Sequence, residues 1–400
     1  MLLKMKAAFI YGNADFYKDK QGKIYSGGTV TKQVWERYLK HFEKIVAVGR
    51  FMGNPPKEKK LTNITMENVE IKLIPSTNGI KSIISNSSHI RKICRSVLSN
   101  VEFAIIRLPS VTGIIACHEA NKLGKPYLVE IVGCIKDALW YHGSLRGKIA
   151  SLPMFLLNKH FIKKAPSALY VTQDFLQGRY PSSGLSIGCS DVTIESFNES
   201  ILEYRKNKIE KMNTNTTIKL GLIGSLNVNY KGHKTAIRAL SLINRKVNVE
   251  LHLLGSGDKR RWIKFARKLG VEEKVVFHGV LPSGRPVLEW MDELDIYIMP
   301  SLTEGLPRAL VEAMSRALPV IGANTGGIPE LLELENLHSP KDHKELAKKI
   351  FDLITSKKIL IVSSERNFNY SKRYCIEKLN YKRNEFMLDL MNQNNLKFKD

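Results

Sequence analysis

Short apolar runs alternate with longer amphipathic runs along most of the chain, and this pattern constrains the fold more than any other feature. In the first half the short runs are Ala7–Tyr11, Ile45–Gly49, Val69–Ile74, Ala104–Arg107, Tyr127–Val132 and Ala168–Thr172. In the second half they are Lys219–Ile223, Val249–Leu254, Val275–His278, Ile296–Met299 and Val320–Ala323. Helical patterns lie between them, such as Thr31–Phe42 and Gly113–Leu123. Strands buried on both faces have near-continuous apolar sequences, so the pattern predicts an α/β protein with parallel sheets covered by helices on both sides.

The alternation occurs twice, and 400 residues are too many for one ordinary core. We therefore expect two doubly wound, Rossmann-like domains. The polar, turn-rich segment Pro181–Thr217 marks the boundary between them, so the expected domains are residues 1–190 and 200–370. Residues 371–400 are a C-terminal extension, and one or two final helices are expected over Tyr370–Asn395.

The composition is that of a soluble globular protein, with 43% hydrophobic and 25% charged residues. The sequence has no apolar run of about 18 residues, the length that a transmembrane helix needs. The apolar part of MLLKMKAAFIYGN is too short for a signal peptide and is interpreted as a first buried strand. The 5 cysteines are scattered without CxxC spacing, which argues against disulfides and zinc. These features predict a cytoplasmic protein.

The formal net charge of +24 is spread over both halves of the chain. Such a surface favours anionic partners, namely nucleic acid, acidic lipids or phosphorylated substrates, although it can also be an ordinary solvated surface. A nucleic-acid-binding protein would gather basic residues and aromatics on one face or carry a known binding module. The sequence has no such module and its charge is diffuse, so nucleic acid is not the expected partner.

Ligands of open α/β sheets bind beyond the carboxyl ends of the strands, so the loops that follow strands are the candidate sites. In the first such loop, Gly27 and Gly28 precede a helix expected to begin near Thr29. Adjacent glycines let backbone N–H groups approach an anion, but they also suit a simple turn.

Two loops of the second half have weaker signals. Lys231 precedes Gly232 just before a helix, where a lysine can reach a phosphate or simply lie on the surface. After Val275–His278, the backbone around Leu281 can contact the edge of a planar base or form an ordinary β–α turn.

The stretch PSLTEGLPRALVEAMSRALPVIGANTGGIPE (residues 300–330) has the richest pattern. Glu304 precedes a helix start with Pro307 at its expected first position, and the N–H groups there form an anion site. Glu312 lies eight residues further on, about 12 Å along a helix. A carboxylate on each side of a bound anion suits a diphosphate flanked by two rings that carry hydroxyl groups. The alternative is an acid favoured by the helix dipole and a solvated helix residue.

These residues resemble the E-x7-E region of the GT-B glycosyltransferases, in particular the large family 4 of retaining enzymes. The match EG.....VEAM...PVI....GGIPE is long, and the loops at Lys231 and Leu281 fit it as well. The resemblance is strong over residues 216–345 and mostly architectural over residues 1–200. It implies two domains facing across a cleft, the first for the acceptor and the second for the donor, with the C-terminal helix crossing back to the first. It also implies sugar transfer from a UDP- or GDP-sugar to an acceptor hydroxyl, with no metal cofactor, and the sequence has no DxD triplet.

The resemblance also implies residue roles. Glu312 would bind the ribose, Glu304 the transferred sugar and Lys231 the diphosphate. The remaining implied donor contacts are the backbone of Gly305, Leu306, Pro307 and Arg308 with phosphate or sugar, Leu281 with the base, and Gly28 with the diphosphate or the acceptor.

Two departures from the family pattern affect these roles. Ser225 stands where many members have an arginine after the strand glycine, so part of the positive charge facing the diphosphate must come from elsewhere. The segment Val129–Gly133 has no histidine where many members carry one. Glu130 and Asp137 are the nearby acids that could position the acceptor hydroxyl instead.

The expected setting is the assembly of a surface polysaccharide, such as capsule or O-antigen, on a glycan or lipid-linked acceptor. The apolar segment Ala150–Ile162 and nearby basic clusters can dock on an anionic membrane at the inner face of the cytoplasmic membrane, or the segment can be a buried helix. A nucleotide-sugar epimerase of the same fold is the alternative enzyme.

Overall fold

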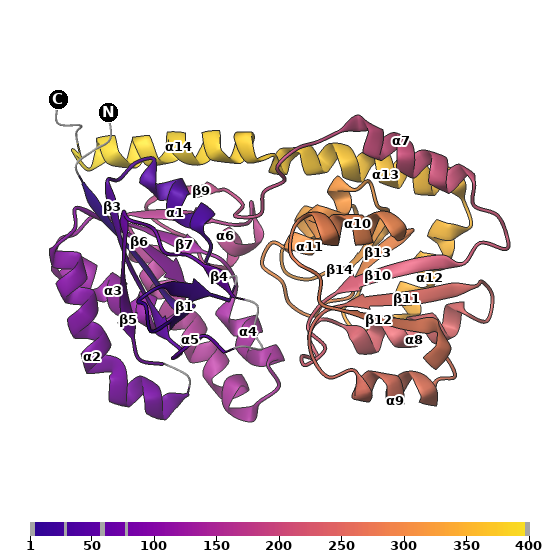
Figure 1. Ribbon diagram of the computed structural model, residues 1–400, viewed down its shortest axis with the longest axis horizontal. Coiled ribbons are helices and arrows are strands. Elements are labelled where there is room, and N and C mark those ends of the chain that lie inside the picture. Colours follow the sequence, from indigo (N-terminus) through magenta and orange to yellow (C-terminus); the bar gives the residue numbers. More distant parts are fainter. Residues whose placement is uncertain (1–4, 28–29, 57–60, 77–78, 397–400) are drawn as a thin grey trace. The chain divides into compact units, whose positions relative to one another are not determined.

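A parallel sheet organises each of the two compact units into which the chain divides (Figure 1). The computed structural model describes residues 5–27, 30–56, 61–76 and 79–396. One unit comprises the described residues of Met1–Ile135, Pro153–Cys189 and Asn380–Asp400. The other comprises Lys136–Leu152 and Ser190–Leu379.

The first sheet places strands that are distant in sequence side by side. In spatial order its parallel strands are β5 (Val69–Ile74), β3 (Lys44–Phe51), β1 (Lys6–Lys18), β6 (Phe103–Leu108), β7 (Tyr127–Ile131), β8 (Ser167–Tyr170) and β9 (Leu185–Gly188). The outer half of β1 pairs antiparallel with β2 (Ile24–Ser26), which pairs with β4 (Thr62–Asn63). The helices of this half are α1 (Lys32–Leu39), α2 (Ile80–Ser99), α3 (Val111–Lys122), α4 (Ile135–Tyr141), α5 (Leu145–Lys164) and α6 (Phe175–Arg179).

The second sheet is parallel throughout its described strands and is doubly wound. Its order is β12 (Val275–Gly279), β11 (Val249–Leu254), β10 (Ile218–Ile223), β13 (Ile296–Met299), β14 (Val320–Ala323) and β15 (Leu337–His338). The helices that follow are α7 (Glu199–Glu210), α8 (His233–Ile243), α9 (Arg260–Lys268), α10 (Arg285–Glu293), α11 (Arg308–Ser315), α12 (His343–Ile354), α13 (Lys357–Ser371) and α14 (Ile376–Gln393). Short 3-10 turns are η1 (Glu272–Lys274), η2 (Ile328–Glu330), η3 (Leu334–Asn336) and η4 (Lys372–Tyr374). Because β10 pairs with β13 and not with β12, the winding reverses between β10 and β13.

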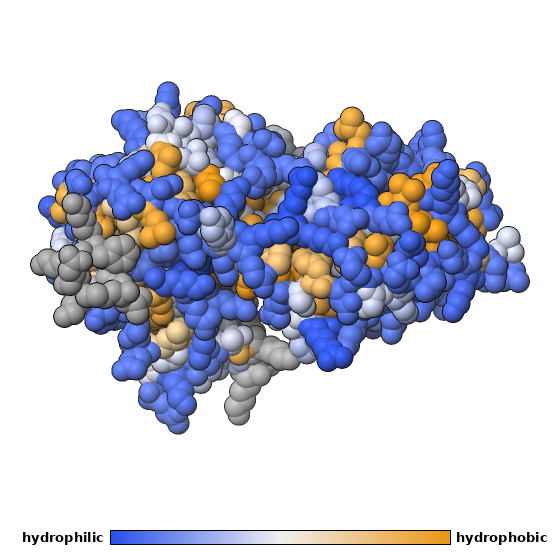
Figure 2. Space-filling view, turned by 90° about the horizontal axis from the view of Figure 1, so that it is seen from above, coloured by the Kyte–Doolittle hydropathy of each residue, from blue (hydrophilic) through white to orange (hydrophobic). Residues whose placement is uncertain are grey.

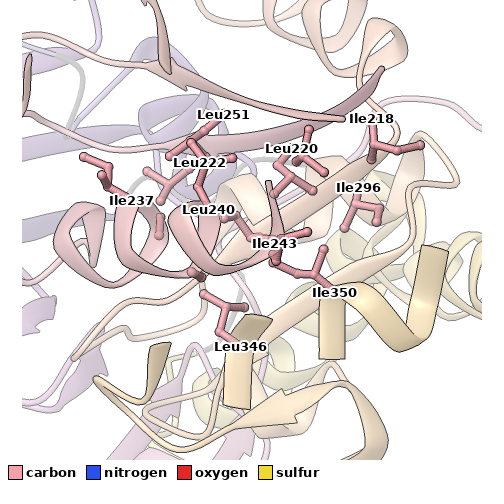
Figure 3. Close-up of a cluster of buried hydrophobic side chains, with 14 of the residues drawn as sticks. Ile218, Leu220, Leu222, Ile237, Leu240, Ile243, Leu251, Ile296, Leu346 and Ile350 are labelled. Carbon is pink, nitrogen blue, oxygen red and sulfur yellow. The ribbon is translucent and has the colours of Figure 1, made fainter. Parts of the chain in front are cut away.

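The core of the second unit forms between its sheet and the helices α8 and α12. Figure 3 shows Leu220 and Leu222 of β10 and Leu251 of β11 facing Ile237 and Leu240 of α8. Each fully buried side chain of this size contributes about 1.5–3 kcal/mol to folding. This packing holds the carboxyl ends of β10 and β13 in fixed positions.

Two expectations about the elements are corrected. β1 continues to Lys18, because Ala14, Phe16 and Tyr17 are buried and let the strand extend into a hairpin with β2, where a loop was expected. α1 begins at Lys32, later than the expected start near Thr29. The two units divide at Ser190, within the expected boundary segment Pro181–Thr217, which also contains β9 and α7.

The surface is predominantly hydrophilic on the face that Figure 2 shows, where apolar residues lie in separate groups. Within the described ranges, no helix is both long enough and apolar enough to cross a membrane.

Candidate active site

The loops after β10 and β13 meet where the winding of the second sheet reverses. Gly232, at the end of the β10 loop, has φ +79° and precedes α8. A Cβ there would collide with the carbonyl oxygen of Pro300, at the end of β13. The amide of Leu302 also donates to the carbonyl oxygen of Tyr230 at 2.7 Å. The two loops are therefore held together by backbone contacts, and only glycine fits at position 232.

Lys231 and Glu304 form an ion pair across these two loops. The Lys231 Nζ lies 2.7 Å from Glu304 Oε1, and the two side chains are 24% and 11% exposed. The aliphatic stem of Lys231 lies against Gly224, where any side chain would occupy its place. The pair places a positive and a negative group side by side, open to solvent on one side.

The start of α11 is next to Glu304 and has no side-chain cap. Asp342 caps α12 by accepting hydrogen bonds from the amides of Lys344 and Glu345. In contrast Pro307, the residue before α11, provides no such bond, so amides of the first turn remain available to a ligand. Pro307 stands one position earlier than expected, because α11 begins at Arg308. Gly305 is half-buried, Leu306 is buried and Arg308 is exposed.

Glu312 lies on the second turn of α11 and is half-buried. Burial raises the pKa of its carboxyl, and the positive charge of Arg308 opposes this only in part. Among the described residues its carboxylate has no hydrogen-bond or ion-pair partner. Burial raises the pKa of the Tyr297 phenol on β13, and the negative charges of Glu304 and Glu312 raise it further. A carboxylate in this position can accept hydrogen bonds from hydroxyl groups.

The loop after β14 supports the backbone of Glu304. Gly326 has φ +59°, and a Cβ there would collide with the Glu304 carbonyl oxygen. The Gly327 amide donates to the carbonyl oxygen of Gly305 at 2.9 Å, and Thr325 Oγ1 donates to that of Leu302 at 3.1 Å. The position of Glu304 is thus set by three loops.

Arg261 of α9 is a residue of this region that the sequence analysis missed. Its guanidinium donates to the carbonyl oxygens of Leu226 and Val228 and to Asn229 Oδ1, so a positive charge lies on the loop that carries Ser225 and Lys231. Arg260 and Arg261 are adjacent in sequence, and Arg260 pairs with Asp258 instead. The only sequence signal that pointed to Arg261 was the position of α9, which follows β11, the strand next to β10.

Ser225 makes a structural contact between two loops. Its hydroxyl donates to the carbonyl oxygen of Ser256 at 3.3 Å, which links the β10 and β11 loops. Leu281 lies in the loop after β12, the edge strand of the sheet, two strands away from β10. The structure therefore brings Lys231, Glu304 and the start of α11 together, and the base contact expected of Leu281 stays a prediction.

Glu130 is the predicted site residue that the structure does not support. It is 1% exposed in β7, where it accepts from the Tyr38 hydroxyl and pairs with Arg107 Nε at 2.7 Å. Burial alone would raise its pKa, but Arg107 and Arg37 outweigh burial, and the net pKa is lowered. This carboxylate is a buried counterion of the core and cannot reach an acceptor.

The other predicted residues of the first half have different outcomes. Asp137 is half-buried in the first turn of α4. Gly28 lies outside the described residues. Within the described part of the chain, no group of three or more His, Cys, Asp or Glu side chains is arranged to hold a metal ion.

Comparison with known proteins agrees with this geometry. Residues 217–356, which include all the site loops of the second sheet, match the family described as glycosyl transferases group 1. Over 387 residues the chain is 35% identical to Protein CapJ of Staphylococcus aureus, covering 96% of this chain and 95% of that protein. Over 111 residues, or 26% of this chain and 27% of the relative, it is 37% identical to the amylovoran biosynthesis glycosyltransferase AmsK of Erwinia amylovora.

The fold is that of solved GT-B glycosyltransferases. One such structure is Anabaena Alr3699/HepE in complex with UDP-glucose, with a TM-score of 0.63, 16% identity, and coverage of 96% of this chain and 100% of that one. The two Rossmann-like domains and the site at the switch point of the second define a GT-B glycosyltransferase. The chain belongs to the group 1 glycosyl transferase family.

Proposed function

We propose that this glycosyltransferase moves a sugar from a UDP- or GDP-sugar to an acceptor hydroxyl, with retention of the anomeric configuration and without a metal ion. The observation that carries the proposal is the convergence of Lys231, Glu304 and the uncapped start of α11 at one strand end. A cation, free amides and a carboxylate there suit a diphosphate joined to a sugar. The UDP-glucose complex of a protein with the same fold supports a nucleotide-sugar donor.

The carboxylates divide the donor between them. Glu312, on the second turn of α11, accepts hydrogen bonds from the ribose hydroxyls. Glu304 accepts from hydroxyls of the sugar that is transferred. Its partner Lys231 then faces the diphosphate between the two rings, and the backbone of Gly305 to Arg308 contributes N–H groups.

The chemical step breaks the bond between the anomeric carbon and the diphosphate oxygen, the acceptor oxygen forms the new bond, and the proton of the acceptor hydroxyl passes to the departing diphosphate. Negative charge builds up on the departing diphosphate, and donors already fixed in place stabilise it at little reorganisation cost. Lys231 and the first amides of α11 act in this way. This positive environment replaces a divalent cation in the proposed mechanism.

Arg261 compensates for the serine at position 225. Its guanidinium is anchored on the loop that runs from Ser225 to Lys231, so its charge adds to the positive potential at that strand end. It is fixed by two carbonyl oxygens and acts through its electric field.

The acceptor is proposed to be a glycan or a lipid-linked sugar, with Asp137 as the candidate to position its hydroxyl. The relative named for amylovoran biosynthesis supports a role in polysaccharide assembly, such as capsule or O-antigen. We place the enzyme at the inner face of the cytoplasmic membrane.

A thermal-shift screen against nucleoside diphosphates and nucleotide-sugars tests the donor, because a specific ligand raises apparent stability. The preferred donor is then incubated with and without a lipid-linked acceptor, and products are followed by NMR of the anomeric proton. Transfer with the donor configuration is expected. Isomerisation of the donor without acceptor would assign an epimerase, and inversion would refute retention.

A further inference from the structure

The helix α5 carries an apolar stripe on its solvent side. The stripe consists of side chains spaced by four, three and four residues, which lie on one side of a helix, and each is between 54% and 73% exposed: Leu145, Ile149, Leu152 and Leu156. Single exposed apolar residues are common on soluble proteins, but a continuous row of four is not. We call these four residues the docking face.

The inner side of α5 carries polar side chains beside apolar ones such as Ile162. Ser151 and Asn158 lie on this side and are buried. They bond only within the helix, from Ser151 Oγ to the Lys148 carbonyl oxygen at 2.7 Å and from Asn158 Nδ2 to that of Met154 at 2.8 Å. Packing inside the protein therefore does not explain the apolar residues on the outer side.

Basic side chains border the docking face, and α5 contains no acidic residue. Lys148 and Lys159 lie along one edge of the stripe and Arg146 and Lys164 along the other, as a helical period of 3.6 residues places them. The Lys148 Nζ lies 5.6 Å from the ring centre of Trp140 of α4, which is 48% exposed. Tryptophan and long basic side chains with apolar stems are typical of membrane interfaces.

The basic character continues at the C-terminal end of α5. Lys163 lies in line with the docking face, eighteen residues or five helical turns after Leu145. A shallow hollow of about 550 Å³ there is lined in part by His160, Lys163, Lys164 and Ser183. The apolar row thus ends at a group of cations and a hydroxyl, the groups that bind a phosphate.

We propose that the docking face of α5 inserts into the surface of an anionic lipid bilayer while the bordering lysines and arginine contact its head groups. A second copy of the chain would bring the same basic borders together and be repelled. Nucleic acid would match the charge but leave the apolar row in water. The inference rests on the proposed function in one respect, since a lipid-linked acceptor would lie in the same membrane, but docking requires neither donor nor transfer.

Sedimentation of the full-length chain with vesicles tests the proposal. Vesicles of phosphatidylcholine alone are compared with vesicles containing one quarter phosphatidylglycerol, at 0.1 M salt. Ile149→Gln/Leu152→Gln/Leu156→Gln removes most of the docking face. Its control, Ile359→Gln/Val362→Gln, changes residues of α13 that are 50% and 55% exposed. Lys148→Gln/Lys163→Gln/Lys164→Gln is compared with Lys234→Gln/Lys264→Gln/Lys268→Gln, which removes as many exposed lysines from α8 and α9.

Binding to the anionic vesicles is expected to fall at least tenfold in both α5 variants and less than twofold in both controls. Equal losses in an α5 variant and its control would overturn the proposal, as would unchanged binding. A dimer in analytical ultracentrifugation that the apolar α5 variant abolishes would assign the face to a second copy instead. UDP binding by calorimetry separates the two proposals, because vesicle binding without nucleotide affinity supports docking and refutes the donor site.

Discussion

Lys231 and Glu304 neutralise each other across two loops of the second sheet, with 2.7 Å between Nζ and Oε1. In the function that we propose, a nucleotide-sugar that enters the site meets a cation already held in place and a carboxylate already oriented. Each group then contacts both its partner and the ligand. Lys231 also binds phosphate, and Glu304 also accepts hydrogen bonds from hydroxyl groups. The ion pair therefore prepares both contacts before the donor arrives.

Replacing Lys231 with alanine should weaken UDP binding by about 2 kcal/mol, roughly thirtyfold, because a charge-assisted contact to the diphosphate is lost. Calorimetry measures this. The free energy of unfolding should change by less than about 1 kcal/mol, since the pair is partly exposed. Lys234→Ala, which removes an exposed lysine three residues later, is the control and should leave UDP affinity unchanged. Equal effects of the two changes would refute the role of Lys231.

Glu304→Gln and Glu312→Gln should affect different parameters. Glu312→Gln is expected to weaken UDP binding about tenfold, since its carboxylate accepts two ribose hydroxyls. Glu304→Gln should lower kcat by at least tenfold and change UDP affinity less than threefold, because UDP lacks the transferred sugar. Steady-state kinetics and calorimetry with UDP separate the two. If both variants matched the wild type, the donor assignment would be wrong.

The pH dependence of donor binding should reflect Glu312. Burial raises the pKa of this carboxyl, so the ionised form that accepts hydroxyls is lost at a higher pH than for an ordinary glutamate. UDP affinity should therefore decline as pH falls towards 5 and do so less in Glu312→Gln. Calorimetry across pH 5 to 7.5 measures the difference between the two proteins.

The same raised pKa has the opposite consequence for stability. A folded-state pKa above the unfolded value makes the ionised group destabilising, fully so above the folded pKa and not at all below the unfolded one. Glu312→Gln should thus raise the Tm of the unliganded protein at pH 7.5 and have less effect near pH 4. A lower Tm at neutral pH would contradict this assignment.

Glu130→Gln should reduce stability and not catalysis. It removes the buried charge that pairs with Arg107 and Tyr38, and breaking a buried pair costs about 3–5 kcal/mol. Chemical denaturation should show a lower midpoint with an unchanged slope, while the exposed control Glu43→Gln stays within about 0.5 kcal/mol of wild type. A loss of kcat at wild-type stability would restore the acceptor role to Glu130.

Much of the second sheet and its site could be predicted because the signal is local. The residues from Glu304 to Glu312 form one loop and one helix, so their spacing in sequence is close to their spacing in space. Because the signal is local, the expected start of α11 at Pro307 differs from the observed start at Arg308 by only one residue. A glycine such as Gly326 could also be singled out, although its contact with Glu304 could not.

Contacts between distant segments could not be predicted. Arg261 reaches the Ser225 loop from another helix, and Glu130 finds Tyr38 and Arg107 on two other elements. Nothing in the neighbouring sequence distinguishes these residues from surface charges. The inner and outer sides of α5 are both partly apolar, so periodicity alone did not identify the side that faces solvent.

The glycine contacts at Gly232 and Gly326 have an evolutionary consequence. These contacts fix the loops around Glu304 mainly through main-chain atoms. The side chains of those loops therefore contribute less to holding them in place. Mutation can therefore exchange side chains at the site, and with them the sugar that is accepted, while the frame persists. A scaffold of this kind allows one family to diversify over many glycans.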